Sequence, residues 1–235
     1  MNYNINKKTI MLHGLNDDII SYFKNKDFKD YYFTFDDGLA SLYKYKDFLK
    51  DIAENNKVII SVNPFIVNEA CESEVNTDFI ECFRAHDKIK YKSDFSHFLN
   101  LEMLKEIIYS HNNIKIGLHD CDHFLGITYK PEYSFINSGI TRLHSTPEKL
   151  SLKMKEYQNR IMYQISWLYK NFPEEKENKI IYFTWPYNDE RQFYKIAWRM
   201  FEKKENKKII YFGKGRITGF WNYYKKDKND RENEK

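Results

Sequence analysis

Short apolar runs rich in β-branched and aromatic residues recur along the chain. Runs of this kind, bounded by polar or turn-forming residues, predict strands. They are found at 9–12, 31–35, 57–62, 114–118, 133–136, 180–183 and 209–212. Amphipathic segments separate most of them. Because strands that alternate with helices assemble into a parallel sheet, the pattern predicts an α/β fold.

The clearest helical spacing of apolar residues lies in three segments. They are 42–55, 101–109 and 147–172. Thr146 is a suitable N-cap for the last of these, and Pro147 suits its first turn. The stretch 63–100 is long for a connection, although it contains a further predicted helix around 78–86. We interpret this stretch as an elaborated loop.

The composition indicates one large globular domain. Hydrophobic residues make up 42% of the 235 residues and aromatic residues 17%, which provides for a substantial core and excludes a wholly disordered chain. A single barrel commonly has this length. We therefore assign 1–224 to one domain. The charged tail 225–235 contains no apolar residue and is predicted to be disordered.

Charge and targeting signals narrow the function classes. The 38 basic and 34 acidic residues are interspersed and leave a net charge of +4, so no concentrated basic face indicates a nucleic-acid partner. No apolar run is long enough for a signal peptide or a membrane span. Three cysteines without CxxC spacing fit reduced thiols better than a disulfide framework. The sequence thus predicts a cytoplasmic protein.

Polar and reactive side chains directly follow several of the predicted strands. They are His13, Asp36 and Asp37, His119 and His123, and the segment 184–187. In parallel α/β folds the carboxyl ends of the strands meet at one rim, where catalytic groups gather. The sequence therefore predicts that these four segments contribute to one site.

The residue types at this predicted site suit a divalent cation. His119 and His123 are four residues apart and can bind one metal ion beside a carboxylate. Asp36 and Asp37 would repel each other if both were ionised in one pocket, and a cation relieves that repulsion. One carboxylate then binds the metal and the other serves as a base. The alternatives are a chance HxxxH pattern and a solvated DDG turn. Cys121 either approaches the metal or is a small buried residue.

Three motifs make the sequence recognisable. FTFDDG at 33–38, LHDCDH at 118–123 and TWPYN at 184–188 resemble, in order and spacing, the motifs of the polysaccharide deacetylase family. This family is also described as NodB-homology proteins or carbohydrate esterase family 4, and the resemblance spans roughly 9–217. It implies a distorted (β/α)7 barrel of the NodB-homology type. It also implies hydrolysis of the N-acetyl group of an N-acetylated sugar or glycan with a divalent metal, zinc being the first choice.

The resemblance implies a role for each matching residue. Asp36 corresponds to the catalytic base. The corresponding metal ligands are Asp37, His119 and His123. Pro186 and Tyr187 correspond to the wall of the substrate groove, with the Tyr187 N–H helping to hold the oxyanion. Trp185 precedes them in the same motif and completes the predicted substrate-binding set.

The motifs differ from the family pattern at two positions. Asp120 follows the first histidine where the family usually has Ser or Thr. Thr184 stands two residues before the proline, where the family usually has the arginine that orients the base. The resemblance therefore does not identify the partner of Asp36.

The family's usual catalytic histidine near the C-terminus is missing from the end of this sequence. MLHG at 11–14 resembles that motif, displaced to the front. This placement resembles a circularly permuted branch that includes the poly-N-acetylglucosamine deacetylases. It suggests His13 as the general acid, with Asp17 or Asp18 as the anion that would favour its protonated form.

Two functions are open at this stage. The first is a metal-dependent carbohydrate deacetylase acting in surface-glycan biosynthesis or modification, on a polymer or on a small nucleotide-linked or lipid-linked sugar. The alternative is a catalytically weak or inactive glycan-binding protein that retains the deacetylase fold. Metal content and acetate release distinguish the two.

Overall fold

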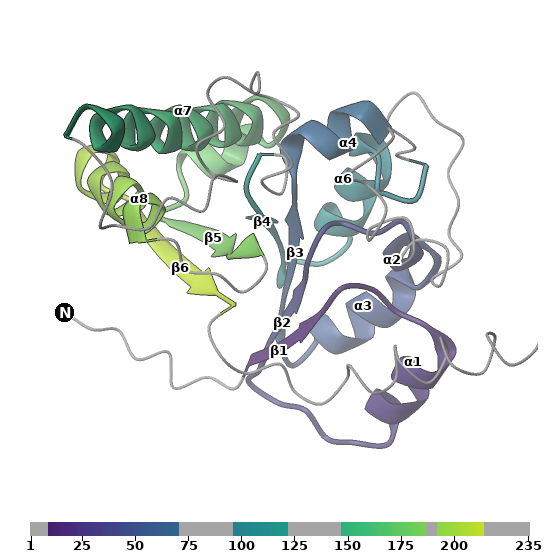
Figure 1. The fold of residues 1–235 in the computed structure, drawn as a ribbon. Coiled ribbons are helices and arrows are strands. Elements are labelled where there is room, and N and C mark those ends of the chain that lie inside the picture. Colours follow the sequence, from purple (N-terminus) through teal and green to yellow (C-terminus); the bar gives the residue numbers. More distant parts are fainter. Residues whose placement is uncertain (1–8, 71–95, 122–146, 187–191, 214–235) are drawn as a thin grey trace, which may run out of the picture. The chain divides into compact units, whose positions relative to one another are not determined.

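A computed structural model describes residues 9–70, 96–121, 147–186 and 192–213 (Figure 1). It contains a sheet of six parallel strands whose spatial order follows the chain. The strands are β1 (Thr9–Leu12), β2 (Tyr32–Phe35), β3 (Lys57–Val62), β4 (Ile114–Leu118), β5 (Ile180–Thr184) and β6 (Lys208–Phe212). Each agrees with a predicted run to within one residue at either end. The run at 133–136 lies outside the described residues, so the seven-stranded barrel stays a prediction.

Helices connect most of these strands. They are α1 (Asp17–Lys24), α2 (Ser41–Lys44), α3 (Lys46–Ala53), α4 (Pro64–Ala70), α6 (Leu101–Tyr109), α7 (Pro147–Asn171) and α8 (Gln192–Glu205), with a 3₁₀ turn at Pro173–Lys176. The α/β fold class is therefore confirmed. The predicted helices at 101–109 and 147–172 are confirmed as α6 and α7. Thr146 and the helix expected at 78–86 lie outside the described part of the chain. None of the described helices has the length and apolar character needed to cross a membrane.

The single helix predicted at 42–55 is wrong in one respect, because it is divided into α2 and α3. Tyr45 lies between them with φ −112° and ψ 27°, outside the helical region. Its N–H donates to the carbonyl of Leu42, three residues back, at 3.2 Å. The chain therefore closes a tight turn at Tyr45 and begins a new helix, a change that the continuous apolar spacing does not reveal.

The chain forms two compact units, and each is described here by itself. Of the described residues, the first unit comprises 9–61, 67–70 and 96–116, and the second comprises 62–66, 117–121, 147–186 and 192–213. This division does not test the prediction of one domain with a disordered tail. In the first unit β2 is buried on both faces, and α1 packs against it through Phe23, whose ring meets that of Phe33 edge to face at 5.4 Å. Asn16 caps α1 by accepting a hydrogen bond from the Ile19 N–H at 2.8 Å.

The second unit has an aromatic core. In this unit α7 and α8 pack side by side, and α8 also packs against β6 (Figure 1). Phe183 lies 5.0 Å from Trp198 between ring centroids, and Trp185 stacks on Tyr211 at 5.5 Å. The buried side of α7 also carries polar residues at four-residue spacing. They are Glu156, Arg160 and Gln164, which share one helix face and are all buried. A buried polar row inside an apolar core requires partners.

Candidate functional site

The first unit brings together three of the predicted site residues, His13, Asp36 and Asp37. The register of β1 and β2 pairs Leu12 with Phe35, and the Asp36 N–H continues this pairing by donating to the Leu12 carbonyl at 2.8 Å. His13 and Asp36 therefore leave neighbouring parallel strands at the same end. This arrangement supports the expectation that residues after strands converge, within this unit.

The turn after β2 has an unusual backbone. Asp37 and Gly38 both have left-handed φ values, 67° and 68°. Glycine adopts this region without cost, whereas for aspartate it is uncommon. The segment that follows is held by 97–99: the Leu99 N–H donates to the Gly38 carbonyl at 2.7 Å, and the Ala40 N–H donates to the His97 carbonyl at 2.9 Å. Backbone hydrogen bonds therefore hold the turn at its start, from Asp36 to Leu12, and at its end, to 97–99.

The two carboxylates of this turn are buried. Asp36 is 5% exposed and Asp37 is 2% exposed. The alternative of a solvated DDG turn is therefore wrong. Burial of two adjacent carboxylates is costly unless positive charge or hydrogen bonds compensate it. The cation that the sequence predicts beside these carboxylates stays a prediction.

His13 lies beside Asp37. Its Nε2 is 3.6 Å from Oδ2 of Asp37, and its side chain is 26% exposed. The sequence offered Asp17 or Asp18 as the anion near His13, whereas the carboxylate found there belongs to Asp37. His13 thus lies within ion-pair distance of the buried acid, and its side chain is partly exposed to solvent.

In the second unit His119 follows β4 and is 2% exposed. Its N–H donates to the Val62 carbonyl at 2.9 Å, and its Nδ1 lies 3.0 Å from the Thr184 carbonyl oxygen. Because a carbonyl oxygen only accepts, Nδ1 carries the hydrogen. In the neutral ring Nε2 then holds the lone pair, which is the form of histidine that binds metals. The acceptor of this hydrogen bond is the backbone oxygen of Thr184, the residue that stands where the polysaccharide deacetylase family usually has an arginine.

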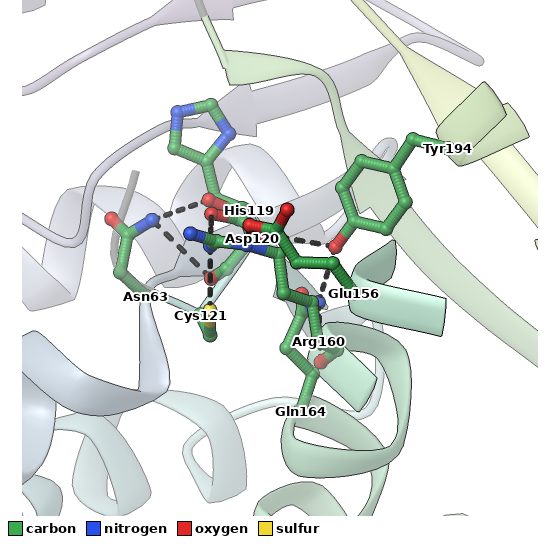
Figure 2. A network of polar contacts seen from close by, with 8 residues as sticks. All are labelled: Asn63, His119, Asp120, Cys121, Glu156, Arg160, Gln164 and Tyr194. Carbon is green, nitrogen blue, oxygen red and sulfur yellow. Dashed lines mark hydrogen bonds and ion pairs between the residues drawn. The ribbon is translucent and has the colours of Figure 1, made fainter. Parts of the chain in front are cut away.

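The residue after His119 is held by a buried network (Figure 2). Asp120 has a left-handed φ of 66° and is fully buried. Its Oδ2 accepts a hydrogen bond from Arg160 Nη1 at 2.7 Å, and its Oδ1 accepts one from the Tyr194 hydroxyl at 2.9 Å. Burial and the charge of Asp120 raise the pKa of Tyr194 well above its usual value, so the hydroxyl remains a donor.

The network extends to further side chains of the second unit. Arg160 Nη1 also donates to Cys121 Sγ at 2.8 Å, and its Nε lies 3.7 Å from Glu156 Oε1. Gln164 Nε2 donates to the Tyr194 hydroxyl at 2.6 Å. Asn63 Nδ2 donates to the carbonyl of His119, and it lies 3.4 Å from the carbonyl of Asp120. Cys121 is buried as expected, but its neighbour is the guanidinium.

The remaining predicted site residues lie in or next to the segment after β5. Trp185 is buried among the rings of Phe183, Tyr194 and Tyr211, and Pro186 is also buried. His123 and Tyr187 lie outside the described residues. Among the residues that the structure describes, no three His, Cys, Asp or Glu side chains gather in a metal-binding group. The predicted ligand set includes His123 and therefore stays a prediction.

Sequence reasoning missed the partners of Asp120. Arg160 and Tyr194 are distant in the chain and belong to no motif. The available signal was weak: Glu156, Arg160 and Gln164 lie beside the apolar face of a long helix, at a spacing that a solvated face also shows. Their burial is visible only in the folded chain.

Comparison with known proteins supports the fold. No family model matches the chain, and no curated protein matches it. One solved structure, that of IcaB from Ammonifex degensii, is similar with a TM-score of 0.50 and 13% sequence identity. The likeness covers 91% of this chain and 93% of that chain. At this identity the likeness shows the fold alone, and the chain therefore shares its overall fold with that structure.

Proposed function

We propose that this protein is a metal-dependent hydrolase that removes the acetyl group from an N-acetylated sugar or glycan. The observation that carries the proposal is the state of His119. This buried histidine follows β4, and its Nδ1 is bonded to a backbone carbonyl, so that Nε2 holds the lone pair. The distant deacetylase-like fold and the buried pair Asp36 and Asp37 support the same conclusion.

The residues proposed as metal ligands suit a divalent cation. Imidazole nitrogen and carboxylate oxygen are the ligands that zinc takes in catalytic sites, where a position stays open for water. Asp37 and His119, each buried in its own unit, are two of the proposed ligands, and His123 is the third. When bound, the cation supplies Lewis-acid activation of water and of the amide carbonyl.

The chain's own residues are proposed to move the protons. Asp36 accepts a proton from the attacking water as the new carbon–oxygen bond forms. His13 donates a proton to the nitrogen as the carbon–nitrogen bond breaks, because an amide anion is a very poor leaving group. The products are acetate and a free amine. The adjacency of β1 and β2, which these two residues follow, supports this division of roles.

Substrate binding is proposed to involve Trp185, Pro186 and Tyr187, with the Tyr187 N–H stabilising the oxyanion. The test of the whole proposal is acetate release from a panel of N-acetylhexosamine substrates that includes the free sugar, a nucleotide-linked sugar and an oligosaccharide. We expect release from at least one class. Metal binding without acetate release from any of these substrates would favour the alternative, a glycan-binding protein with this fold.

Removal of one proposed ligand is expected to empty the metal site. His119→Ala and His123→Ala should each lose most of the metal that the parent protein retains after dialysis, because the remaining ligands bind far more weakly. Elemental analysis of folded protein measures this. The control is His111→Ala, a histidine outside the proposed ligand set whose Nε2 lies 3.7 Å from Glu54 Oε1. Full metal occupancy in both ligand variants would refute the assignment.

A further inference from the structure

We propose that the buried ion pair between Asp120 and Arg160 positions His119, holding its ring in one orientation with Nδ1 directed at the Thr184 carbonyl. The inference rests on the proposed function, in which Nε2 of the same ring binds the metal. Asp120 and Arg160 are thus positioning residues. Neither is assigned a direct contact with substrate or metal.

The pair is not explained by stability. The side chains of Asp120 and Arg160 are 0% and 1% exposed, so both charges have lost their water shells. Desolvation of a buried pair commonly costs as much as the attraction returns, and apolar residues of similar volume often stabilise a fold equally well or better. A buried charge pair in an aromatic core is therefore better explained by the geometry that it imposes.

The backbone beside His119 needs such a constraint. Asp120 lies in the left-handed region, which is unfavourable for a residue with a side chain. Two helices hold its carboxylate, α7 through Arg160 and α8 through Tyr194, with one donor for each oxygen. The same guanidinium nitrogen that bonds Asp120 also reaches Cys121, so one side chain fixes two successive residues of the turn.

The polar network constrains His119 through its main chain, not through its imidazole ring. Figure 2 shows the imidazole directed away from the network, while the main chain of His119 and Asp120 lies within it. Asn63 donates to the His119 carbonyl, and the His119 N–H donates to the Val62 carbonyl. With the Cα–Cβ direction fixed in this way, the hydrogen bond from Nδ1 to the Thr184 carbonyl favours one rotamer and one tautomer of the ring.

The test separates the effect of the ion pair on stability from its effect on the orientation of the His119 ring. It compares three variants: Asp120→Asn, Arg160→Met and the double variant. Arg160→Met alone leaves a carboxylate buried without its cation, so its urea midpoint should fall markedly. The double variant carries neither charge and should recover most of that midpoint. If the pair positions His119, the double variant should recover its stability, but its His119 ring should no longer be held in the orientation of the parent protein.

The first readout is independent of metal. Long-range ¹H–¹⁵N NMR of the metal-free protein at pH 8 should show His119 of the parent as the Nδ1–H tautomer. The double variant should show averaging between the two tautomers. The second readout is Zn²⁺ affinity, measured by competition with a chelator, which should be 10-fold to 100-fold weaker in the double variant, the usual effect of losing a supporting contact around a ligand.

The matched control is Gln164→Leu. This residue lies one turn further along α7, is fully buried, and bonds Tyr194 but not Asp120. It should lower the urea midpoint and leave the tautomer and the Zn²⁺ affinity as in the parent. If the double variant keeps the single Nδ1–H tautomer or the parent's Zn²⁺ affinity, the pair is only structural and the inference is wrong. A parent protein that binds no Zn²⁺ would overturn the proposed function, while the NMR comparison would still decide whether the pair positions the ring.

Discussion

Asp36→Asn is expected to keep its metal and to lose acetate release by a factor on the order of 10² to 10⁴, the usual contribution of a general base. The amide is nearly isosteric with the carboxylate, so the turn after β2 should keep its shape. It cannot accept the proton of the attacking water, however, and that step then lacks its base. Asp36 is almost fully buried, so bulk water cannot readily take its place as the proton acceptor. Steady-state acetate release and elemental analysis of the same preparation measure the two effects.

The matched control for this variant is Asp30→Asn. Asp30 lies in the same unit and has a left-handed φ of 61°, but it is exposed and precedes β2 instead of following it. Its substitution should change neither metal content nor turnover. Wild-type turnover in Asp36→Asn would mean that the base lies elsewhere.

His13→Ala is expected to lower kcat by on the order of 10² to 10⁴ with little change in metal content or substrate binding. The reason is the leaving group: breaking an amide bond requires protonation of the nitrogen. An ester of the same sugar releases an alkoxide, which leaves more readily than an amide anion. The defect should therefore be smaller on the ester than on the amide, and comparing kcat for the two substrates measures the difference.

His111→Ala controls for the loss of a partly exposed histidine. Its side chain is 25% exposed, against 26% for His13, and it also lies beside a carboxylate in the first unit. It should leave kcat unchanged on both substrates. An equal loss on ester and amide in His13→Ala, or no loss on either, would contradict the role of general acid.

The local sequence pattern was sufficient to predict the strands and to locate the polar residues that directly follow them. The described strands coincide with the apolar runs because buried strand positions need apolar side chains, and a short apolar run bounded by polar or turn-forming residues has the length of a strand. The positions of His13, Asp36 and His119 follow directly, since each is the first residue after such a run. The α/β class could therefore be predicted from the amino-acid sequence, while the roles of the candidate site residues stay a prediction.

The tautomer, burial and charge partners of these residues depend on contacts between segments that are distant in the chain. The tautomer of His119 depends on a carbonyl oxygen 65 residues away in the chain, at Thr184. The burial of Asp36 and Asp37, and the contact of Asp37 with His13, depend on how the turn packs. The ion pair between Asp120 and Arg160 joins the end of β4 to α7. In the sequence, the polar residues on that side of α7 have the spacing of a solvent-exposed helix face. Periodicity reports which side chains are apolar, whereas the partner of a buried polar group is set by the packing of elements far apart in sequence.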